Sequence, residues 1–362
     1  MKILYDPQAF VHPYGGASRY YVEVIDYLKR KSDLEIELPL IYAQNSHLKE
    51  KGLHKPFIDK FFKIKYKYSL SFRALQLNQW YLKRKLKQGN FDIFHPTHYD
   101  PYFLPYLKGK PYIATVLDMI HELGLVKNTT QAALDEKRIS MENATKIVAI
   151  SQKTKEDLVR LLNIPEEKVV VIYLATDFQP TPKILTEKKY ILFTGNRMNY
   201  KNFDRFIEAV APIVTNQKDL YIRLTGVPLT AAEIQKIADL KLTEKVDLEV
   251  FVDEKRLMEL YSNALCFVFP SLYEGFGIPI VEAFACECPT AISKASCFPE
   301  VAGDASLYFD PYSVEDMRHK IQQLVDNESL RKDLKAKGKV RSQYFSWANT
   351  ARQHESLYQS LI

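Results

Sequence analysis

The sequence contains little cysteine. Only four of its 362 residues are cysteine, and all four lie in the C-terminal half, at Cys266, Cys286, Cys288 and Cys297. No second pair of Cys or His stands at the spacing of a zinc site. We therefore interpret the four as buried free thiols in a reducing compartment, with zinc binding as the second choice.

Long apolar runs are also missing from the sequence. No stretch approaches the ~20 apolar residues that a helix needs to span a bilayer. The N-terminal residues MKILYDPQAF lead directly into an apolar strand and do not have the pattern of a signal peptide. We expect a cytoplasmic protein whose membrane contact, if it has one, is peripheral and on the inner face of the cell membrane.

Acidic residues are nearly absent from residues 48–87, which contain twelve Lys or Arg and two acids. The net charge of this tract is +10. Because the whole chain has a net charge of +6, the remaining residues together carry −4. Its alternation of basic and aromatic residues suits anionic lipid headgroups or a phosphorylated acceptor. A solvated face whose lysine stems cover apolar surface is an equally weighted alternative. Nucleic acid is not expected as a partner, because no recognition motif accompanies the charge.

The length of the chain and its 46% hydrophobic content fit two globular domains. Short apolar segments typical of buried strands alternate with amphipathic segments typical of helices. Such alternation predicts an α/β fold in which helices cover parallel sheets. A polar segment with two prolines lies between two strand-rich halves, so we expect an N-terminal domain at 1–176, a linker at 177–189 and a C-terminal domain at 190–344.

The individual elements follow from the same patterns. We expect strands at 2–5, 37–43, 92–95, 112–117, 146–151 and 169–174 in the first half, and at 190–195, 221–226, 248–251, 265–269 and 289–293 in the second. We expect helices at 17–31, 69–88, 130–142 and 153–163.

Residues 273–285, YEGFGIPIVEAFA, form the most specific pattern in the chain. Pro279 predicts a helix that begins just after Gly277, because Pro is tolerated where the first amides have no helical partner. Gly277 lets a ligand approach those amides, and such a helix end binds phosphates. Glu274 and Glu282 suit hydroxyl groups. The pattern predicts a sugar joined to a nucleotide by a diphosphate, and the alternative is a surface helix with two solvated acids.

The pattern resembles the E-x(7)-E signature of retaining glycosyltransferases of family 4, of the bacterial surface-glycan type with the GT-B fold. Residues 288–311 are similar to the strand and PEVAGDA loop that follow the signature in that family. The resemblance implies two doubly wound parallel-sheet, Rossmann-like domains facing a cleft. It implies that Glu274 acts at the donor sugar, that Glu282 holds the ribose hydroxyls, and that a helix at 345–362 crosses back to the N-terminal domain.

Further donor-binding residues follow from the resemblance. The Gly15-Gly16 turn is similar to the family's N-domain glycine loop, and Lys201 matches a Lys-Asn position that grips the donor diphosphate. Arg197, in the same loop, is the candidate for a second positive charge. The remaining donor-side candidates are Gly275 and Phe276 beside Gly277, and Phe251 and Val252, whose backbone would contact the base.

The acceptor side is expected in the N-terminal domain. Residues 115–124, TVLDMIHELG, resemble the family's His-Asp segment, with Leu117 where the family often has His. Asp118 is the second candidate catalytic residue. The acceptor-side candidates are Arg19, His95, His98, Asp100 and His121. We expect none of these histidines to hold a metal, because no third ligand is suitably spaced.

The resemblance implies a retaining hexosyltransferase that uses a GDP- or UDP-linked sugar and acts on a lipid-linked or growing surface polysaccharide. No Asp-x-Asp pair occurs in the chain, so we expect no metal and no other cofactor, with cations and helix-end amides binding the diphosphate instead. Two alternatives stay open: a nucleotide-sugar epimerase of the same fold, and a non-catalytic scaffold that binds nucleotide sugars.

Overall fold

The structure is a computed structural model. It describes residues 1–362 apart from 14, 44, 54–67 and 185–187. Much of the basic tract predicted at 48–87 therefore lies outside the described residues. The described chain forms two compact units, one of residues Met1–Leu174 with Trp347–Ile362 and one of residues Ala175–Ser346. The described part of the segment predicted as a linker belongs to the second unit.

The first unit contains two three-stranded parallel sheets, ordered β2-β1-β3 and β4-β5-β6. Its strands are β1 (Lys2–Tyr5), β2 (Glu35–Glu37), β3 (Ile93–His95), β4 (Ile113–Val116), β5 (Lys146–Ala149) and β6 (Val169–Val171). A parallel bridge between Phe94 and Tyr112 links the two sheets. Its α-helices are α1 (Gly16–Lys31), α2 (Ser46–Glu50), α3 (Tyr68–Gln88), α4 (Gln131–Asn143), α5 (Gln152–Leu162) and α13 (Trp347–Gln359).

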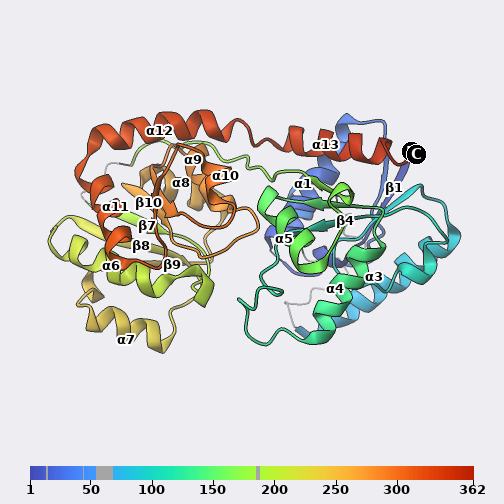
Figure 1. The fold of residues 1–362 in the computed structure, drawn as a ribbon, viewed down its shortest axis with the longest axis horizontal. Coiled ribbons are helices and arrows are strands. Elements are labelled where there is room, and N and C mark those ends of the chain that lie inside the picture. Colours follow the sequence, from blue (N-terminus) through green and yellow to red (C-terminus); the bar gives the residue numbers. More distant parts are fainter. Residues whose placement is uncertain (14, 44, 54–67, 185–187) are drawn as a thin grey trace. The chain divides into compact units, whose positions relative to one another are not determined.

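The second unit contains one six-stranded parallel sheet, ordered β12-β11-β10-β7-β8-β9. Its strands are β7 (Lys189–Phe193), β8 (Leu220–Gly226), β9 (Val246–Val250), β10 (Cys266–Phe269), β11 (Thr290–Ser293) and β12 (Leu307–Phe309). Its α-helices are α6 (Phe203–Thr215), α7 (Ala231–Asp239), α8 (Glu254–Asn263), α9 (Ile278–Ala285), α10 (Phe298–Ala302), α11 (Val314–Asp326) and α12 (Glu328–Ser342). Helix α9 packs on α12 and α11 packs on α6, and the two pairs cover opposite faces of the sheet (Figure 1).

The predicted fold class, α/β with two Rossmann-like parallel-sheet domains, is confirmed. Strands β7 and β10 are neighbours, although chain order places β8 and β9 between them. The strand order therefore reverses between β7 and β10, and open α/β sheets bind ligands at the carboxyl ends of strands beside such a reversal.

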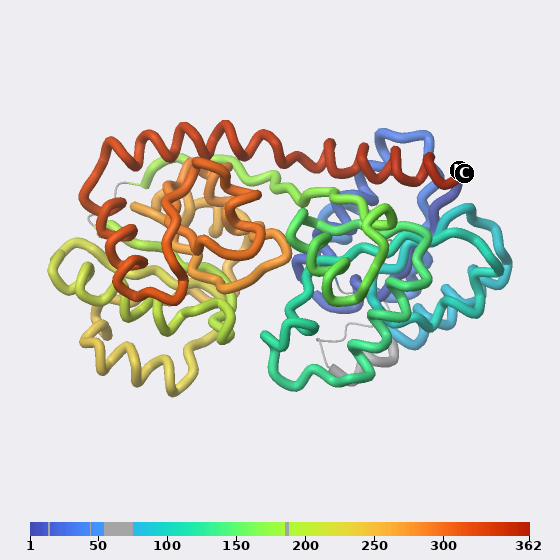
Figure 2. The backbone as a smooth tube through the Cα atoms, in the orientation of Figure 1, coloured from blue at the N-terminus to red at the C-terminus, as the bar shows by residue number. Residues whose placement is uncertain are grey.

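Helix α13 belongs to the first unit and packs against α1, as the backbone in Figure 2 shows. His354 of α13 and Tyr20 of α1 form a hydrogen bond of 2.6 Å between Nε2 and the hydroxyl. The Tyr358 hydroxyl lies 2.7 Å from Nδ1 of His95 at the end of β3. Burial lowers the pKa of His354 to about 3, so the imidazole stays neutral in this contact.

The prediction of a strand at 37–43 is wrong, because β2 covers only Glu35–Glu37. Asn78 of α3 accepts hydrogen bonds from the amides of Ile41 and Tyr42 at 3.0 and 3.1 Å, and its own amide donates to the Tyr42 carbonyl. One side chain thus takes the hydrogen bonds that a neighbouring strand would take. Strand β12, which has only three residues, is a further difference from the predicted strands.

Side chains cap several helices that position loops of the candidate site. Thr130 accepts a hydrogen bond from the Ala133 amide at the start of α4, at 3.2 Å. Thr230 and Glu233 form a reciprocal capping box at the start of α7. These capping hydrogen bonds therefore fix the residue at which each preceding loop ends and its helix begins.

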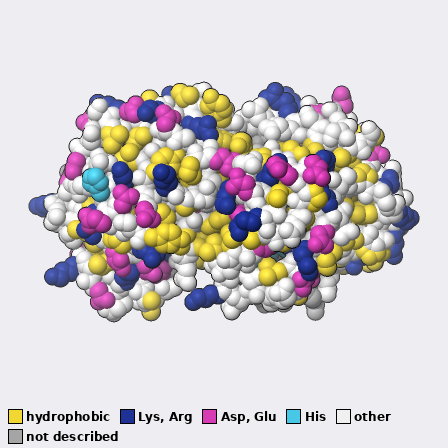
Figure 3. Space-filling model, in the orientation of Figure 1, with side chains coloured by type: hydrophobic (Ala, Val, Ile, Leu, Met, Phe, Trp, Pro, Cys, Tyr) yellow, Lys and Arg dark blue, Asp and Glu magenta, His cyan; other side chains and the backbone are white. Residues whose placement is uncertain are grey.

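All four cysteines are buried free thiols, as predicted. Burial raises the pKa of Cys266 and of Cys286 to about 12. Both thiols thus stay protonated at neutral pH and pack as small apolar groups. On the face drawn in Figure 3, basic and acidic side chains are interspersed over both units. None of the helices in the described ranges is long and apolar enough to cross a bilayer.

Candidate active site

An ion pair spans the point where the strand order of the second unit reverses. Lys201 ends the short 3-10 helix Asn199–Lys201 that follows β7, and Glu274 lies in the loop after β10. The Lys201 ammonium donates a hydrogen bond to Oε1 of Glu274. The two side chains are 18% and 17% exposed, so water still reaches the pair. The structure thus brings together two residues that are 73 positions apart in the chain.

Aromatic rings and a backbone hydrogen bond hold the Lys201 side of this pair. The ammonium lies 5.2 Å from the centroid of the Tyr200 ring and 5.8 Å from that of Phe269. The amide of Leu272 donates to the Tyr200 carbonyl at 2.7 Å, which joins the loops after β7 and β10. The cation is therefore confined to the carboxyl edge of the sheet.

Glu274 is fixed through its backbone by Ser296 and Cys297, which no sequence motif indicated. The Ser296 hydroxyl donates to the Glu274 carbonyl at 2.7 Å and lies 3.3 Å from the Glu274 amide nitrogen. The Cys297 thiol contacts the same carbonyl at 3.3 Å. Ser296 has a φ of +51°, a left-handed conformation that is uncommon for serine. No pattern in the sequence marks a serine 22 residues away as the partner of Glu274.

Helix α9 begins at Ile278 after Gly277, as the sequence predicts, and Pro279 lies in its first turn. Gly277 has a φ of 85°, and an added Cβ would lie 3.1 Å from Ile280 Cδ1 and 3.2 Å from the Phe298 ring. Glycine is therefore required here for both conformation and space. In this turn Pro279 has no N–H, and the Ile280 amide donates to the Gly277 carbonyl at 2.9 Å. The positive end of the helix dipole still lies here, so this helix end can attract an anion.

The side chain of Phe276 is buried, with its ring 5.4 Å from that of Phe345 in an edge-to-face contact. The prediction that Phe276 lines the donor site is wrong for its side chain. The buried ring instead anchors the loop to the core of the second unit. Gly275, before it, is the other glycine of the loop between β10 and α9.

Glu282 lies on α9 and is 5% exposed. The Tyr261 hydroxyl of α8 donates to its Oε2 at 3.4 Å and also lies 3.2 Å from the Thr194 hydroxyl after β7. Burial, and next the charge of Glu282, raise the pKa of Tyr261 well above its usual value. The phenol therefore stays a donor and orients the carboxylate. Tyr261 and Thr194 were not selected from the sequence, and the role of Glu282 at a ribose stays a prediction.

Arg197 does not lie free for a diphosphate. Its Nε donates to Glu233 at 2.8 Å, and its Nη2 donates to the Val227 and Pro228 carbonyls at 2.6 and 2.9 Å. The side chain is only 2% exposed. The prediction that Arg197 supplies a second positive charge is therefore corrected, because the guanidinium joins the β7 loop to the start of α7.

Phe251 and Val252 follow β9 at the same edge of the sheet. Phe251 has a φ of +53° and is 79% exposed, and its amide donates to the Gly226 carbonyl at 3.2 Å. A Cβ at Gly226 would lie 2.4 Å from the Gly195 carbonyl oxygen. The ends of β7, β8 and β9 thus approach closely, and an exposed aromatic ring stands beside them.

In the first unit, Gly15 and Gly16 form the start of α1 and are exposed. A Cβ at Gly16 would meet nothing within 4 Å. The Ser18 hydroxyl donates to the Gly15 carbonyl at 2.8 Å and accepts from Asn45 at 2.9 Å. Arg19 follows on the first turn and is partly exposed. The turn predicted from the sequence therefore presents open space at its glycines.

Asp118 and His121 lie in the loop between β4 and α4. Asp118 is half-buried, and its Oδ1 accepts a hydrogen bond from the Ile120 amide at 3.2 Å. His121 is exposed, and its Nδ1 lies 2.9 Å from the Thr129 hydroxyl. Both residues thus have local partners that define the conformation of the loop.

The prediction of His95 as an acceptor-side residue is corrected. His95 is 1% exposed, and its two ring nitrogens lie within hydrogen-bond distance of Tyr358 and Thr115, at 2.7 and 2.9 Å. Burial, and next the neighbouring His354, lower its pKa well below the usual value. The ring is a neutral core group that no acceptor touches in this conformation.

His98 and Asp100 lie in the loop after β3 and remain acceptor-side candidates. His98 is exposed, and its Nδ1 accepts a hydrogen bond from the Asp100 amide at 3.4 Å. Asp100 in turn accepts from the Tyr102 amide at 3.1 Å. The two side chains therefore organise one loop at the carboxyl edge of the first unit.

Two family models match the chain, one in each half. Residues 14–179 match the model described as Glycosyltransferase Family 4, and residues 176–341 match the one described as Glycosyl transferases group 1. The chain belongs to the glycosyltransferases of family 4. The family resemblance inferred from residues 273–285 and 288–311 is thereby confirmed.

Several known proteins are similar to this glycosyltransferase. It is 24% identical to an O-antigen chain mannosyltransferase B of Escherichia coli over the full length of both chains. It is 31% identical to the serotype-specific mannosyltransferase WbdA of Escherichia coli over 235 residues, which are 59% of this chain and 29% of that one.

Solved structures share the fold. A sucrose-phosphate synthase from Thermosynechococcus elongatus matches with a TM-score of 0.78 and 18% identity, covering 100% of this chain and 99% of that one. HepE of Anabaena, in complex with UDP and glucose, matches with a TM-score of 0.75 and 17% identity, covering 99% and 100%.

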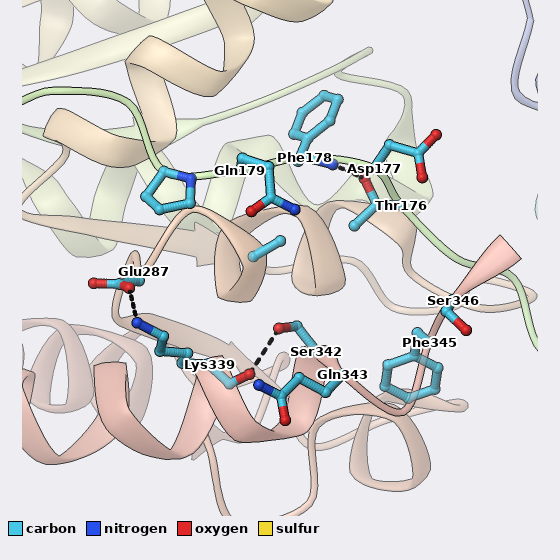
Figure 4. Close-up of a pocket in the computed structure, with 12 residues that line it drawn as sticks. Thr176, Asp177, Phe178, Gln179, Glu287, Lys339, Ser342, Gln343, Phe345 and Ser346 are labelled. Carbon is cyan, nitrogen blue, oxygen red and sulfur yellow. Dashed lines mark hydrogen bonds and ion pairs between the residues drawn. The ribbon is translucent and has the colours of Figure 1, made fainter. Parts of the chain in front are cut away.

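A pocket of about 470 Å³ lies at the other end of α9 in this glycosyltransferase. Its lining comes from residues 176–180, the end of α9, the end of α12 and residues 345–346 (Figure 4). Lys339 and Glu287 form an ion pair of 2.8 Å across it. None of the predicted site residues lines this pocket, so the candidate site rests on the carboxyl edge of the sheet. Nowhere in the described ranges do three or more His, Cys, Asp or Glu side chains gather as a metal site would require.

Proposed function

We propose that this glycosyltransferase transfers a hexose from a nucleotide diphosphate sugar to a hydroxyl of a bacterial surface polysaccharide, with retention of anomeric configuration. Mannose is the first choice for the hexose, because the similar Escherichia coli proteins are named O-antigen and serotype-specific mannosyltransferases. The observation that carries the proposal is the Lys201–Glu274 pair beside the start of α9.

Each residue of that site has a chemical task in the proposal. Negative charge develops on the leaving nucleoside diphosphate, and Lys201 and the positive N-terminal end of α9 stabilise it. Glu274 accepts hydrogen bonds from hydroxyls of the donor sugar and orients it, and Glu282 does so for the ribose. The exposed ring of Phe251 lies beside the base. The family's front-face displacement, with the leaving phosphate as base, gives retention.

The diphosphate is bound without a metal ion in this proposal. Its support is the absence of an Asp-x-Asp pair from the sequence, together with one lysine and a helix N-terminus in the loops that follow β7 and β10. Acceptor binding is proposed for the first unit, through Arg19, His98, Asp100 and His121, with Asp118 as a second catalytic residue.

Peripheral contact with an anionic membrane is proposed for α3. Leu77 and Trp80 are 51% and 59% exposed on this helix, and Arg84 and Lys87 are exposed at the following positions of the same stripe. The spacing of three, four and three residues puts all four on one helix face. A tryptophan with cations beside it suits the headgroup region of a bilayer.

The test is a direct assay of donor and product. GDP-mannose, UDP-glucose and their nucleoside diphosphates are compared by thermal stabilisation, where a ligand at ~100 times its Kd adds about 2.7 kcal/mol. Transfer from the stabilising donor to a mannose-terminated acceptor is then followed, and the new linkage is identified by NMR. Retention predicts the anomeric configuration of the donor in the product. A donor that is bound but isomerised, or never transferred, contradicts the proposal.

A further inference from the structure

A buried cluster of three side chains lies under the loop that carries Asp118. Lys137 of α4 forms an ion pair of 3.1 Å with Glu122 of the loop, and the two side chains are only 3% and 6% exposed. The Lys137 ammonium also lies 4.7 Å from the centroid of the Tyr99 ring. The three groups come from α4 and from the loops that follow β3 and β4.

Two hydrogen bonds connect this cluster to the backbone on both sides of the Leu117–Asp118 peptide. The Lys137 ammonium donates to the carbonyl oxygen of Asp118 at 2.8 Å. The Tyr99 hydroxyl accepts a hydrogen bond from the Leu117 amide at 3.1 Å. The cluster therefore fixes the orientation of the backbone from which the Asp118 side chain projects.

Stability alone gives a poor account of this cluster. Removing a lysine and a glutamate from water is unfavourable, and well-packed apolar side chains often serve a core as well or better. The second carboxylate oxygen of Glu122 is buried and has no hydrogen-bond partner among the described residues. An incompletely satisfied buried pair fits a role in geometry better than one in stability.

We propose that Lys137 is a positioning residue for the transfer reaction, and that with Glu122 and Tyr99 it holds residues 117–122 in the conformation that presents the Asp118 side chain for the reaction. The inference rests on the proposed function. Because Lys137 meets Asp118 only at its backbone carbonyl, it acts through the loop and not on the substrate. A displacement of about 1 Å at a reacting group can lower a rate about 100-fold.

The experiment uses the full-length chain with the double substitution Lys137→Met/Glu122→Gln. Lys137→Met alone would leave a buried carboxylate without its partner and can unfold the protein, whereas the double variant removes both charges together. Arg138→Met is the matched control, since Arg138 is the next residue of α4 and its ion pair with Asp135 is exposed.

We expect the double variant to fold, to keep the KM for the donor within about 2-fold, and to lose kcat by about 10- to 100-fold. Lys137→Arg should recover part of that loss, because it restores the charge. Hydrogen exchange of the amides at 117–123 should be faster in the double variant. The control should match the wild type in all three measurements.

Two results would overturn the inference. One is a folded double variant with wild-type kcat. The other is unchanged hydrogen exchange of the amides at 117–123 in the double variant. That second measurement needs no substrate and tests directly whether Lys137 holds the loop. A wild-type protein that transfers no sugar refutes the proposed function and the catalytic part of the inference. The exchange result then still decides the structural part.

Discussion

Replacing Glu274 by glutamine tests the ion pair at the centre of the candidate site. The carboxylate binds the Lys201 ammonium and also places a negative charge where a diphosphate is expected. Glutamine keeps the size of the side chain and removes the charge. We expect Glu274→Gln to release Lys201 for the nucleotide while it weakens the orientation of the sugar.

The magnitude follows from the exposure of the pair. A hydrogen bond to a charged group contributes about 1.5–3 kcal/mol. The pair is partly solvated, with 18% and 17% of the two side chains exposed, so we take a lower value. A net gain of about 1 kcal/mol corresponds to an about 5-fold lower Kd for the nucleoside diphosphate. Turnover should fall about 100-fold, because a misplacement of about 1 Å has that effect.

Calorimetric titration with GDP and UDP measures the affinity, and a sugar-transfer assay measures the turnover. Glu287→Gln is the control, because Glu287 pairs with Lys339 in the pocket at the other end of α9. It should change neither quantity. A Kd that rises more than 5-fold, or transfer near the wild-type rate, would show that Glu274 does not restrain Lys201 or does not act at the sugar.

Four further results are expected. Glu282→Ala should raise the donor Kd at least about 10-fold, because one or two charged hydrogen bonds are lost; unchanged affinity in a folded variant would place the ribose elsewhere. EDTA should leave transfer intact, and recovery by Mn²⁺ after loss would contradict metal-free binding. The substitutions Trp80→Ser, Arg84→Ser and Lys87→Ser together should reduce binding to anionic liposomes by about 1 kcal/mol per cation without affecting donor binding; a wild type that ignores such liposomes at low salt would leave α3 a solvated face. Asp6 directly follows β1 and is fully buried, and burial raises its pKa to about 7. Its contribution to stability is therefore present below pH ~4 and lost as pH rises through 7. The Tm of Asp6→Asn relative to wild type should therefore increase from pH 4 to pH 8, and a constant difference in thermal unfolding would contradict this.

Most of the fold could be predicted from the sequence, because the periods of helix and strand are local properties. Strand β1 and helices α1, α3 and α9 begin within one residue of the expected positions. The strand expected at 37–43 failed because a distant side chain, Asn78, satisfies the backbone there. A local pattern of apolar residues contains no information about such a partner.

The candidate site was predictable in part, for the same reason. The sequence indicated Lys201, Glu274 and Gly277, because each belongs to a pattern of neighbouring residues. The partners Tyr261 and Ser296 were not predictable, because they meet Glu282 and Glu274 only through the tertiary fold. His95 was misplaced because a strand-end histidine can project either toward the loop edge or into the core.

Arg197 and Lys201 show that tertiary contacts decide which cation of a loop can bind a diphosphate, a question that the sequence leaves open. Arg197 and Lys201 lie four positions apart after β7, and either has the charge to bind a diphosphate. The capping glutamate of α7 and two carbonyls take up the Arg197 guanidinium and bury it. Lys201 instead forms an ion pair with Glu274. A diphosphate can bind the Lys201 ammonium once it replaces this one side-chain contact. Because Arg197 does not face a ligand, the positive end of the α9 helix dipole is the second source of positive potential at this edge. The conformation of Gly277, directly before that helix, therefore matters for binding as well as for the fold.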